Sequence, residues 1–151
     1  MKIALYQPDI AQNLGAAMRL SACFGVSLEI IEPCGFPLTS KALRRTAMDY
    51  GAPDTLIRHK SWDNFVKSES NTKNRLVLLT TKAAQPITDF TFTKHDTLLF
   101  GRESAGVPDE VHAHANARLY IPIAHGARSF NLVSSASIAL FEGLRQTGGL
   151  P

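Results

Sequence analysis

The rest of this chain is organised around residues Leu119–Thr147, LYIPIAHGARSFNLVSSASIALFEGLRQT. It predicts a short buried strand over Leu119–Ile123, a polar loop, and then one long helix. The helix has an apolar face at helical spacing, formed by Leu132, Ala136, Leu140 and Leu144. Because a helix N-terminus offers unpaired N–H groups and a partial positive charge, this order of elements favours a ligand site at the start of the helix. A helix that only covers a sheet would show the same periodicity, so both interpretations stand at this point.

The composition is that of an ordinary soluble globular protein. Of the 151 residues, 44% are hydrophobic and 19% are charged, which fits one domain over residues 1–151 with no separate RNA-binding extension. Sixteen Lys and Arg against thirteen Asp and Glu give a net charge of +3, so a nucleic-acid partner is allowed and not demanded. The amino terminus runs directly into a strand and no apolar run is long enough to span a bilayer, which argues against secretion and membrane insertion.

Residues that form disulfides or bind metals are sparse. Cys23 and Cys34 are too few for a disulfide framework or a zinc site, and we expect both to be reduced, buried thiols in a cytoplasmic protein. The five histidines form no ligand pattern. The sequence therefore predicts no metal site.

Strands and helices alternate along the whole chain. Five further strands are predicted, over Lys2–Tyr6, Val26–Ile31, Thr55–Arg58, Arg75–Thr80 and Thr97–Phe100. Helices are predicted to follow the N-caps Asn13 and Ser40, to start at Ser61 and to begin at Pro108, and a polar loop is predicted over Ser68–Asn74. This alternation predicts an α/β fold with a single parallel sheet and helices on both faces. Ligands bind such sheets beyond the carboxyl ends of the strands, so the loops after Thr80, Phe100 and Ile123 should meet in one site.

Three groups of residues could carry chemistry. Asn13, Gly15 and Arg19 open the first helix, where the glycine leaves room for a partner and the arginine reaches across it; a capped helix with a solvated arginine is the simpler explanation. FGRESAGVP, residues 100–108, has two glycines for tight turns and Glu103 to accept N–H groups, although an ordinary strand-to-helix connection explains it as well. Ile121–Ser135 mixes polar side chains with apolar walls, as small-molecule pockets do.

The order of these motifs resembles that of the SPOUT-class RNA 2′-O-methyltransferases: NxGxxxR at Asn13–Arg19, FGxExxG at Phe100–Gly106, and IPI with SFNLxxSxS at Ile121–Ser137. The segments IIEPCGF, LRR and LTTK are most similar to the compact TrmL-like branch, and the resemblance runs from end to end. It implies methylation of the ribose of the wobble nucleotide, cytidine or uridine, in certain tRNAs, with S-adenosylmethionine as the cofactor. It also implies the SPOUT α/β knot, a deep trefoil knot at the carboxyl end, and a homodimer with Phe141 and Leu144 at the interface.

The resemblance assigns roles position by position. The catalytic set that it implies is Arg19, Asn13, Glu103, Ser129 and Asn131. The cofactor-binding set is Leu79, Thr80, Gly101, Glu103, Gly106, Ile121, Ile123, Ser129 and Leu132. RNA would be held by positive charge, for which the candidates are Arg19, Lys41, Arg44 and Arg45, although a solvated helix face explains the last three as well. Motif two varies in the family at Arg102 and Ser104, which leaves the RNA contacts beside this loop open.

The implied reaction is in-line transfer of a methyl group from a sulfonium to a ribose 2′-oxygen. The protein must position donor and acceptor and help the hydroxyl lose its proton. An arginine is a poor base, so we expect Arg19 to hold the adjacent phosphate and stabilise the developing alkoxide, while a phosphate oxygen or water takes the proton. Three alternatives remain: the same enzyme acting on ribosomal or another RNA, a non-catalytic RNA-binding dimer, and a flavodoxin-like nucleotide binder.

Overall fold

The computed structural model describes residues 1–38 and 56–151, and in this part of the chain all strands belong to one parallel sheet. The strands are β1 (Lys2–Tyr6), β2 (Ser27–Ile31), β3 (Leu56–His59), β4 (Leu76–Leu79), β5 (Gln85–Pro86), β6 (Thr97–Phe100) and β7 (Ala117–Tyr120). Their spatial order is β3-β2-β1-β6-β4-β7-β5, so β6 inserts between β1 and β4. The predicted single parallel sheet is confirmed.

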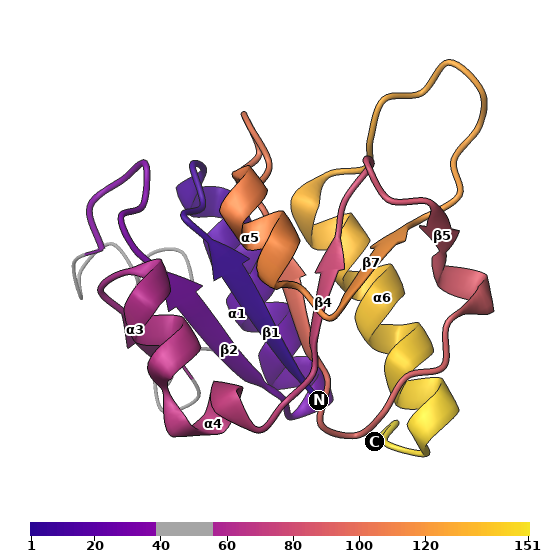
Figure 1. The fold of residues 1–151 in the computed structure, drawn as a ribbon, viewed down its shortest axis with the longest axis horizontal. Helices are drawn as coiled ribbons and strands as arrows, with labels where there is room; N and C mark the ends of the chain where they lie inside the picture. The colour runs from indigo at the N-terminus through magenta and orange to yellow at the C-terminus, as the bar shows by residue number, and fades with distance from the viewer. Residues whose placement is uncertain (39–55) are drawn as a thin grey trace.

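Helices cover both faces of this sheet, as predicted (Figure 1). The helices are α1 (Ala11–Phe24), α3 (Trp62–Lys67), α4 (Glu69–Thr72), α5 (Asp109–His114) and α6 (Leu132–Thr147), with a 3₁₀ turn η3 at Ile87–Asp89. α1 and α6 pack together on one face, where the larger part of the core lies. α3 and α5 cover the opposite face, where Phe65 and Val111 are buried against the sheet. No helix in the described residues is long and apolar enough to cross a membrane.

The deciding helix α6 forms as predicted, and its four apolar positions are all buried. The strand before it ends earlier than predicted, at Tyr120 instead of Ile123. Its neighbour β5 pairs only with Leu119 and Tyr120, so the backbone beyond Tyr120 has no strand to pair with and Pro122 has no N–H to offer. Ile121 and Ile123 therefore leave the sheet and enter a loop.

The start of α1 differs from the prediction. The helix begins at Ala11 after Ile10, so Asn13 lies inside its first turn and is not the N-cap. Its amide bonds instead with side chains far along the sequence. The predicted stop is confirmed, because Gly25 ends the helix in the left-handed conformation at φ 64°. A helix starts at Ser61 as predicted, and the structure shows that Ser61 caps it by accepting the N–H of Asn64.

Two other predictions are wrong. The polar stretch Ser68–Asn74 contains the short helix α4 instead of a loop. Cys23 is exposed, because it falls on the side of α1 opposite to the buried Leu14. Cys34 is partly buried, and this burial raises the pKa of its thiol to about 11. The helix predicted after Ser40 lies outside the described residues.

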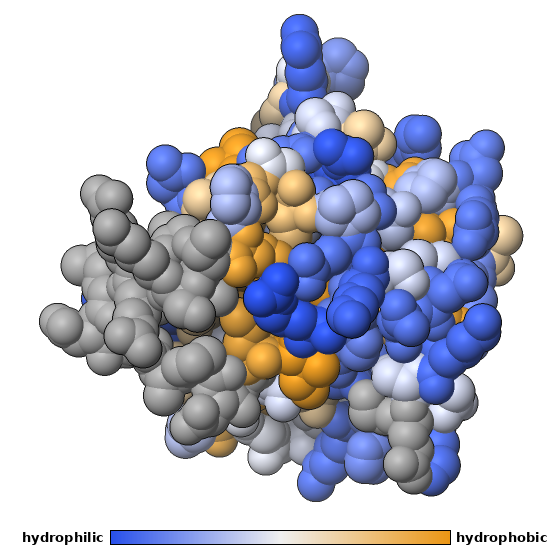
Figure 2. All heavy atoms as spheres, turned by 90° about the vertical axis from the view of Figure 1, so that its left-hand side faces the viewer, coloured by the Kyte–Doolittle hydropathy of each residue, from blue (hydrophilic) through white to orange (hydrophobic). Residues whose placement is uncertain are grey.

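A buried polar cluster lies beneath α3 and α4. Glu29 on β2 is fully buried and accepts hydrogen bonds from Lys2 at 2.5 Å and from Asn71 at 2.9 Å, with His59 Nε2 at 2.7 Å. Burial alone would raise the pKa of Glu29, but the bonds from Lys2 and Asn71 outweigh it and keep the pKa below its usual value. On the face that Figure 2 shows, hydrophobic residues come to the surface among hydrophilic ones. On β3, which is an edge strand of the sheet, Ile57 is 42% exposed.

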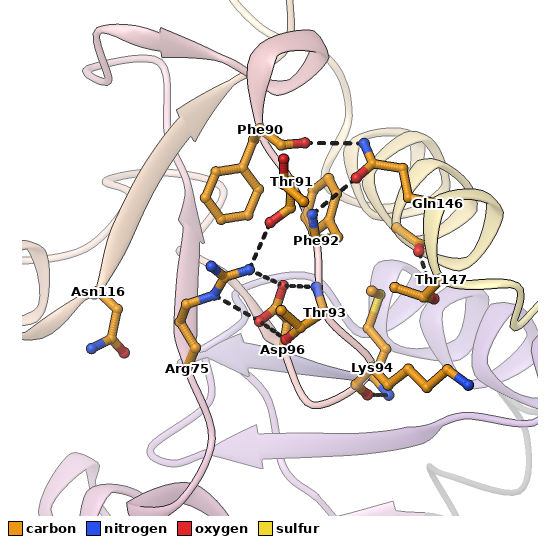
Figure 3. A network of polar contacts seen from close by, with 12 residues as sticks. Arg75, Phe90, Thr91, Phe92, Thr93, Lys94, Asp96, Asn116, Gln146 and Thr147 are labelled. Atoms are coloured by element: carbon orange, nitrogen blue, oxygen red, sulfur yellow. Dashed lines mark hydrogen bonds and ion pairs between the residues drawn. The ribbon is translucent and has the colours of Figure 1, made fainter.

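A second polar network ties the amino ends of β4 and β6 to the end of α6 (Figure 3). Arg75 donates two 2.8 Å bonds to the fully buried Asp96, and its guanidinium lies 4.7 Å from the centre of the Phe90 ring. Gln146 donates to Phe90 O at 3.0 Å and accepts from Phe92 N–H at 2.9 Å. The network stabilises the end of the sheet at which both chain termini lie. The opposite end, where the strands have their carboxyl ends, is left for a site.

Candidate functional site

A cavity of about 470 Å³ lies at the carboxyl ends of β4, β6 and β7. Its walls come from the loop that opens α1, the segment after β4, the loop after β6, and the segment from β7 into α6. The lining residues are Ile10, Asn13, Leu78, Leu79, Thr80, Thr81, Phe100, Gly101, Arg102, Glu103, Gly106, Val107, Ile121, Ile123, Ser129, Phe130, Asn131, Leu132 and Ser135. The predicted meeting of the loops after Thr80, Phe100 and Ile123 is thus found.

All nine residues predicted to bind the cofactor line this cavity. Four of the five predicted catalytic residues, Asn13, Glu103, Ser129 and Asn131, line it as well. The fifth, Arg19, lies on the exposed side of α1 and does not belong to the lining. Their roles remain predictions, but the fold brings eleven different predicted residues, from segments up to about 120 residues apart, to the wall of one cavity.

The loop after β6 closes on itself. Arg102 and Gly106 exchange two backbone hydrogen bonds, of 2.9 and 2.8 Å. A Cβ atom at Gly101 would lie 2.6 Å from the carbonyl carbon of Gly106, so no other residue fits there without moving backbone. Gly106 itself has a φ of 68°, in the left-handed region that favours glycine. The two glycines make the narrow turn that forms one wall of the cavity.

A chain of hydrogen bonds joins the three motif loops. Glu103 accepts from the Asp9 N–H at one carboxylate oxygen and from Asn13 Nδ2 at the other, both at 2.8 Å. Asn13 in turn accepts from Asn131 Nδ2 at 3.1 Å. Glu103 thus accepts N–H groups as predicted, but from the segment after β1 instead of from its own loop. This explains why Asn13 does not cap α1.

Asn131 also caps the helix that closes the cavity. Its Oδ1 accepts the N–H groups of Val133 at 2.8 Å and Ser134 at 3.4 Å. The oxygen of this side chain therefore accepts N–H groups that would be unpaired at the start of α6, and its nitrogen donates to Asn13. At the rim of the cavity, Ile10 and Phe130 are large apolar residues that are 43% and 44% exposed.

Asp9 forms a further pair at the cavity edge. Its Oδ1 accepts from Arg102 Nε at 3.1 Å and Nη2 at 2.7 Å, and its Oδ2 accepts from Ser104 N–H at 3.1 Å and from the Ser104 hydroxyl at 2.6 Å. The bonds from Arg102, followed by those from Ser104, lower the pKa of Asp9 to about 2. The carboxylate also raises the pKa of Arg102.

Sequence reasoning missed Asp9, Ile10, Arg102 and Phe130 as parts of the site. Asp9 and Ile10 precede motif one, and the available signal was that they follow a strand at the carboxyl edge. Phe130 lies within motif three, between two residues that were selected. The predicted RNA-binding residues Lys41, Arg44 and Arg45 lie outside the described residues. Within residues 1–38 and 56–151, no group of three His, Cys, Asp or Glu side chains could hold a metal ion.

The fold is a parallel sheet with helices on both faces, and a partly apolar cavity with a glycine-rich wall lies at the carboxyl edge of that sheet. These two features place the chain in the class of α/β proteins that bind small molecules at this edge. Within this class, the chain belongs to the SpoU rRNA methylase family, whose model matches residues 1–141.

Relatives and solved structures agree with this membership. The chain is 53% identical over 148 residues to a tRNA (cytidine(34)-2′-O)-methyltransferase of Beijerinckia indica subsp. indica, covering 98% of this chain and 92% of the relative. It is 35% identical, with a TM-score of 0.89, to a protein whose structure gave insights into the 2-OH methylation of C/U34 on tRNA, over 96% of this chain and 94% of that one. An rRNA methyltransferase from Sinorhizobium meliloti, solved with AdoMet bound, is 26% identical with a TM-score of 0.80, over 95% of this chain and 55% of that one.

Proposed function

We propose that this protein is a methyltransferase that transfers a methyl group from S-adenosylmethionine to the 2′-oxygen of the wobble nucleotide, position 34, of tRNA. One observation carries the proposal: three separated motifs meet around a single cavity in a chain that is 53% identical to a tRNA (cytidine(34)-2′-O)-methyltransferase. The substrate nucleotide is cytidine or uridine, in keeping with the C/U34 studied for a structural neighbour.

The cavity fits S-adenosylmethionine in size and in chemistry. Its volume of about 470 Å³ lies within the roughly 300–1,000 Å³ of small-molecule sites. Leu79, Ile121, Ile123 and Leu132 supply apolar walls, and Gly101 allows the backbone to approach a ligand closely. The polar partners would be Thr80, Ser129 and the backbone of the glycine loop. When bound, the cofactor supplies an electrophilic methyl group on a sulfonium that leaves as a neutral thioether.

The side chains around the cavity would bind and orient the ribose of the substrate nucleotide and would assist the loss of its 2′-hydroxyl proton. Glu103 uses both carboxylate oxygens on Asp9 and Asn13, so its proposed role is to hold the ribose-facing amides in place. Asn13 and Asn131 would present hydrogen-bonding groups to the ribose, and Ser129 would do so from the opposite loop. The hydroxyl proton would pass to a phosphate oxygen or to water while Arg19 stabilises the developing alkoxide.

A homodimer would bring Arg19 to a cavity. Arg19 does not line the cavity of its own chain, so its proposed role requires a second copy to place it there. An apolar groove between α1 and α6, lined by Leu20, Phe24, Ile138 and Phe141, supports such an interface. Phe141 is 49% exposed, as an interface residue should be, whereas Leu144 is only 5% exposed and belongs to the chain's own core. The prediction that Leu144 contacts a partner is therefore wrong.

Three finer features complete the proposal. The carboxyl-terminal trefoil knot is supported by the likeness to solved methyltransferases of this fold. The tRNA would be held partly by Lys41, Arg44 and Arg45 through its phosphates. A tRNA substrate would place the enzyme in the cytoplasm.

Ribosomal RNA is the second candidate substrate, because the family is described as rRNA methylases and one structural neighbour is an rRNA methyltransferase. Calorimetric titration with S-adenosylhomocysteine, followed by transfer of tritiated methyl to purified tRNA and rRNA from a host lacking the enzyme, separates the two. Binding with label in tRNA alone is the expected result. Label in rRNA alone would replace the substrate, and absence of binding would leave a non-catalytic RNA-binding protein.

A further inference from the structure

Arg102 brings positive charge to the cavity. Of the lining residues, all of which belong to the described chain, it is the only cation, and Glu103 is the only anion. Its side chain is 39% exposed, so it can meet a ligand that arrives from solvent. The proposed substrate is a polyanion, and a cation at the cavity edge is therefore in the place where a phosphate has to approach.

Asp9 fixes the orientation of this cation. Both Nε and Nη2 of Arg102 donate to the same oxygen of Asp9, at 3.1 and 2.7 Å. The other oxygen of Asp9 is held by the backbone and the hydroxyl of Ser104, at 3.1 and 2.6 Å. The carboxylate is thus tied from both sides, and it cannot turn away without losing four hydrogen bonds.

The remaining edge of the guanidinium is available for a second anion. An arginine has five N–H donors in a planar fork, and only Nε and Nη2 are used here. Within residues 1–38 and 56–151, Nη1 has no hydrogen-bond acceptor, and Arg102 is one of the residues that line the cavity. Arginine binds phosphate in a two-pronged manner through such an edge.

The chemistry of the substrate places a phosphate beside the reacting atom. In RNA, the 2′-hydroxyl and the 3′-phosphate are attached to adjacent carbons of the ribose. A nucleotide that presents its 2′-oxygen to the cavity therefore brings its 3′-phosphate to the rim. We propose that Arg102 binds this phosphate and that Asp9 is a positioning residue that holds the guanidinium so that its Nη1 edge faces the RNA. The proposal rests on the proposed methyltransferase function.

The two residues should fail in different ways. Arg102→Gln removes one phosphate contact, so tRNA binding should weaken about tenfold, and the slope of log affinity against log salt should become shallower by about 0.7 to 0.9. Asp9→Asn keeps the cation, so the salt slope should stay unchanged. The loosened guanidinium should instead lower kcat about tenfold, with tRNA affinity within about threefold of wild type. Arg102→Lys should have the wild-type salt slope but a lower kcat than wild type, because the point charge of a lysine lacks the two-pronged geometry of a guanidinium.

Arg145→Gln is the matched control. Arg145 also pairs with a carboxylate through Nε and Nη2, donating to Glu142 at 2.8 Å. It lies thirteen residues beyond the start of α6, roughly 20 Å from the cavity along the helix. This variant should keep the wild-type salt slope.

The measurements are fluorescence anisotropy of labelled tRNA over a series of KCl concentrations, steady-state methyl transfer, and calorimetry with S-adenosylhomocysteine. An unchanged salt slope for Arg102→Gln would overturn the assignment. The assignment would also be overturned if Arg102→Gln and Asp9→Asn both lost S-adenosylhomocysteine binding but kept tRNA binding. The Asp9–Arg102 pair would then only stabilise the loop that forms the cofactor site. A wild-type protein that binds no S-adenosylhomocysteine and methylates no RNA would instead refute the proposed function itself.

Discussion

Replacing Gly101 with alanine should open the glycine loop and weaken cofactor binding. The new Cβ would lie 2.6 Å from the carbonyl carbon of Gly106 and 2.8 Å from its oxygen. Reaching ordinary contact at 3.4 Å requires the two backbone segments to separate by about 0.8 Å, the difference between 3.4 and 2.6 Å. Backbone cannot rotate out of the way as a flexible side chain can, so the loop as a whole has to move.

The size of the effect follows from the bonds that such a shift breaks. The two hydrogen bonds between Arg102 and Gly106, now 2.9 and 2.8 Å, would stretch to about 3.7 and 3.6 Å, beyond hydrogen-bonding distance. At about 1 kcal/mol for each bond, the closed loop loses about 2 kcal/mol. If only the closed loop binds the cofactor, affinity for S-adenosylhomocysteine falls about 30-fold.

Isothermal titration calorimetry measures this affinity, and urea unfolding measures stability in the same preparations. Gly25→Ala is the control: Gly25 has a φ of 64° and open space around it, at the end of α1. It should lose about 1 kcal/mol of stability from backbone strain and keep its affinity. A Gly101→Ala protein that binds S-adenosylhomocysteine within twofold of wild type would refute the claim that this loop forms the cofactor site.

Four other variants and conditions test separate parts of the structure. Asn131→Ala should cost about 1 kcal/mol in urea unfolding because α6 loses its cap, whereas Asn131→Asp keeps the accepting oxygen; equal losses would contradict the capping role. Burial would raise the pKa of Asp96, but the bonds from Arg75 and Thr93 hold it below its usual value, and the pKa of Asp9 is about 2. In acid the unfolded chain therefore binds more protons than the folded chain. The stability that these two carboxylates contribute is present above about pH 4 and is lost as the pH falls towards their folded pKa values. A urea midpoint that stays constant through this pH range would contradict this contribution. Arg75→Gln leaves Asp96 buried without its partner and should cost about 2–3 kcal/mol, below the ~3–5 kcal/mol of a fully buried pair because Arg75 is 36% exposed, while calorimetry shows unchanged S-adenosylhomocysteine binding. Arg19→Lys should lower kcat at least about tenfold with cofactor affinity intact; near-normal turnover would exclude a specific guanidinium role.

The sequence predicted the elements with strong local patterns. The apolar runs of β1, β2, β4 and β6 and the periodic face of α6 are visible in a few neighbouring residues, and the structure has them in place. The two-residue strand β5 has no period to detect, and the polar letters of α4 resemble a loop. The order of strands depends on contacts between distant segments, so nothing near β6 indicates that it inserts between β1 and β4.

The candidate site was found through glycines and polar residues at strand ends, but its connections were not. Asparagine is a residue type that often caps helices, and only the fold shows that the side chain of Asn13 instead donates a hydrogen bond to Glu103, 90 residues away. The pairing of Asp9 with Arg102 spans 93 residues for the same reason. Local patterns identify which residues are available for a site, whereas the sheet decides which of them meet.

Mapping the methylated nucleotide tests directly whether this protein is a wobble-position tRNA methyltransferase. Purified tRNA from a host lacking the enzyme is incubated with the protein and S-adenosylmethionine, digested, and sequenced by mass spectrometry. We expect a single new 2′-O-methyl group on C or U at position 34, and we expect Gly101→Ala to reduce its yield. A methyl group at another position, on a base instead of the ribose, or on no tRNA at all would contradict it.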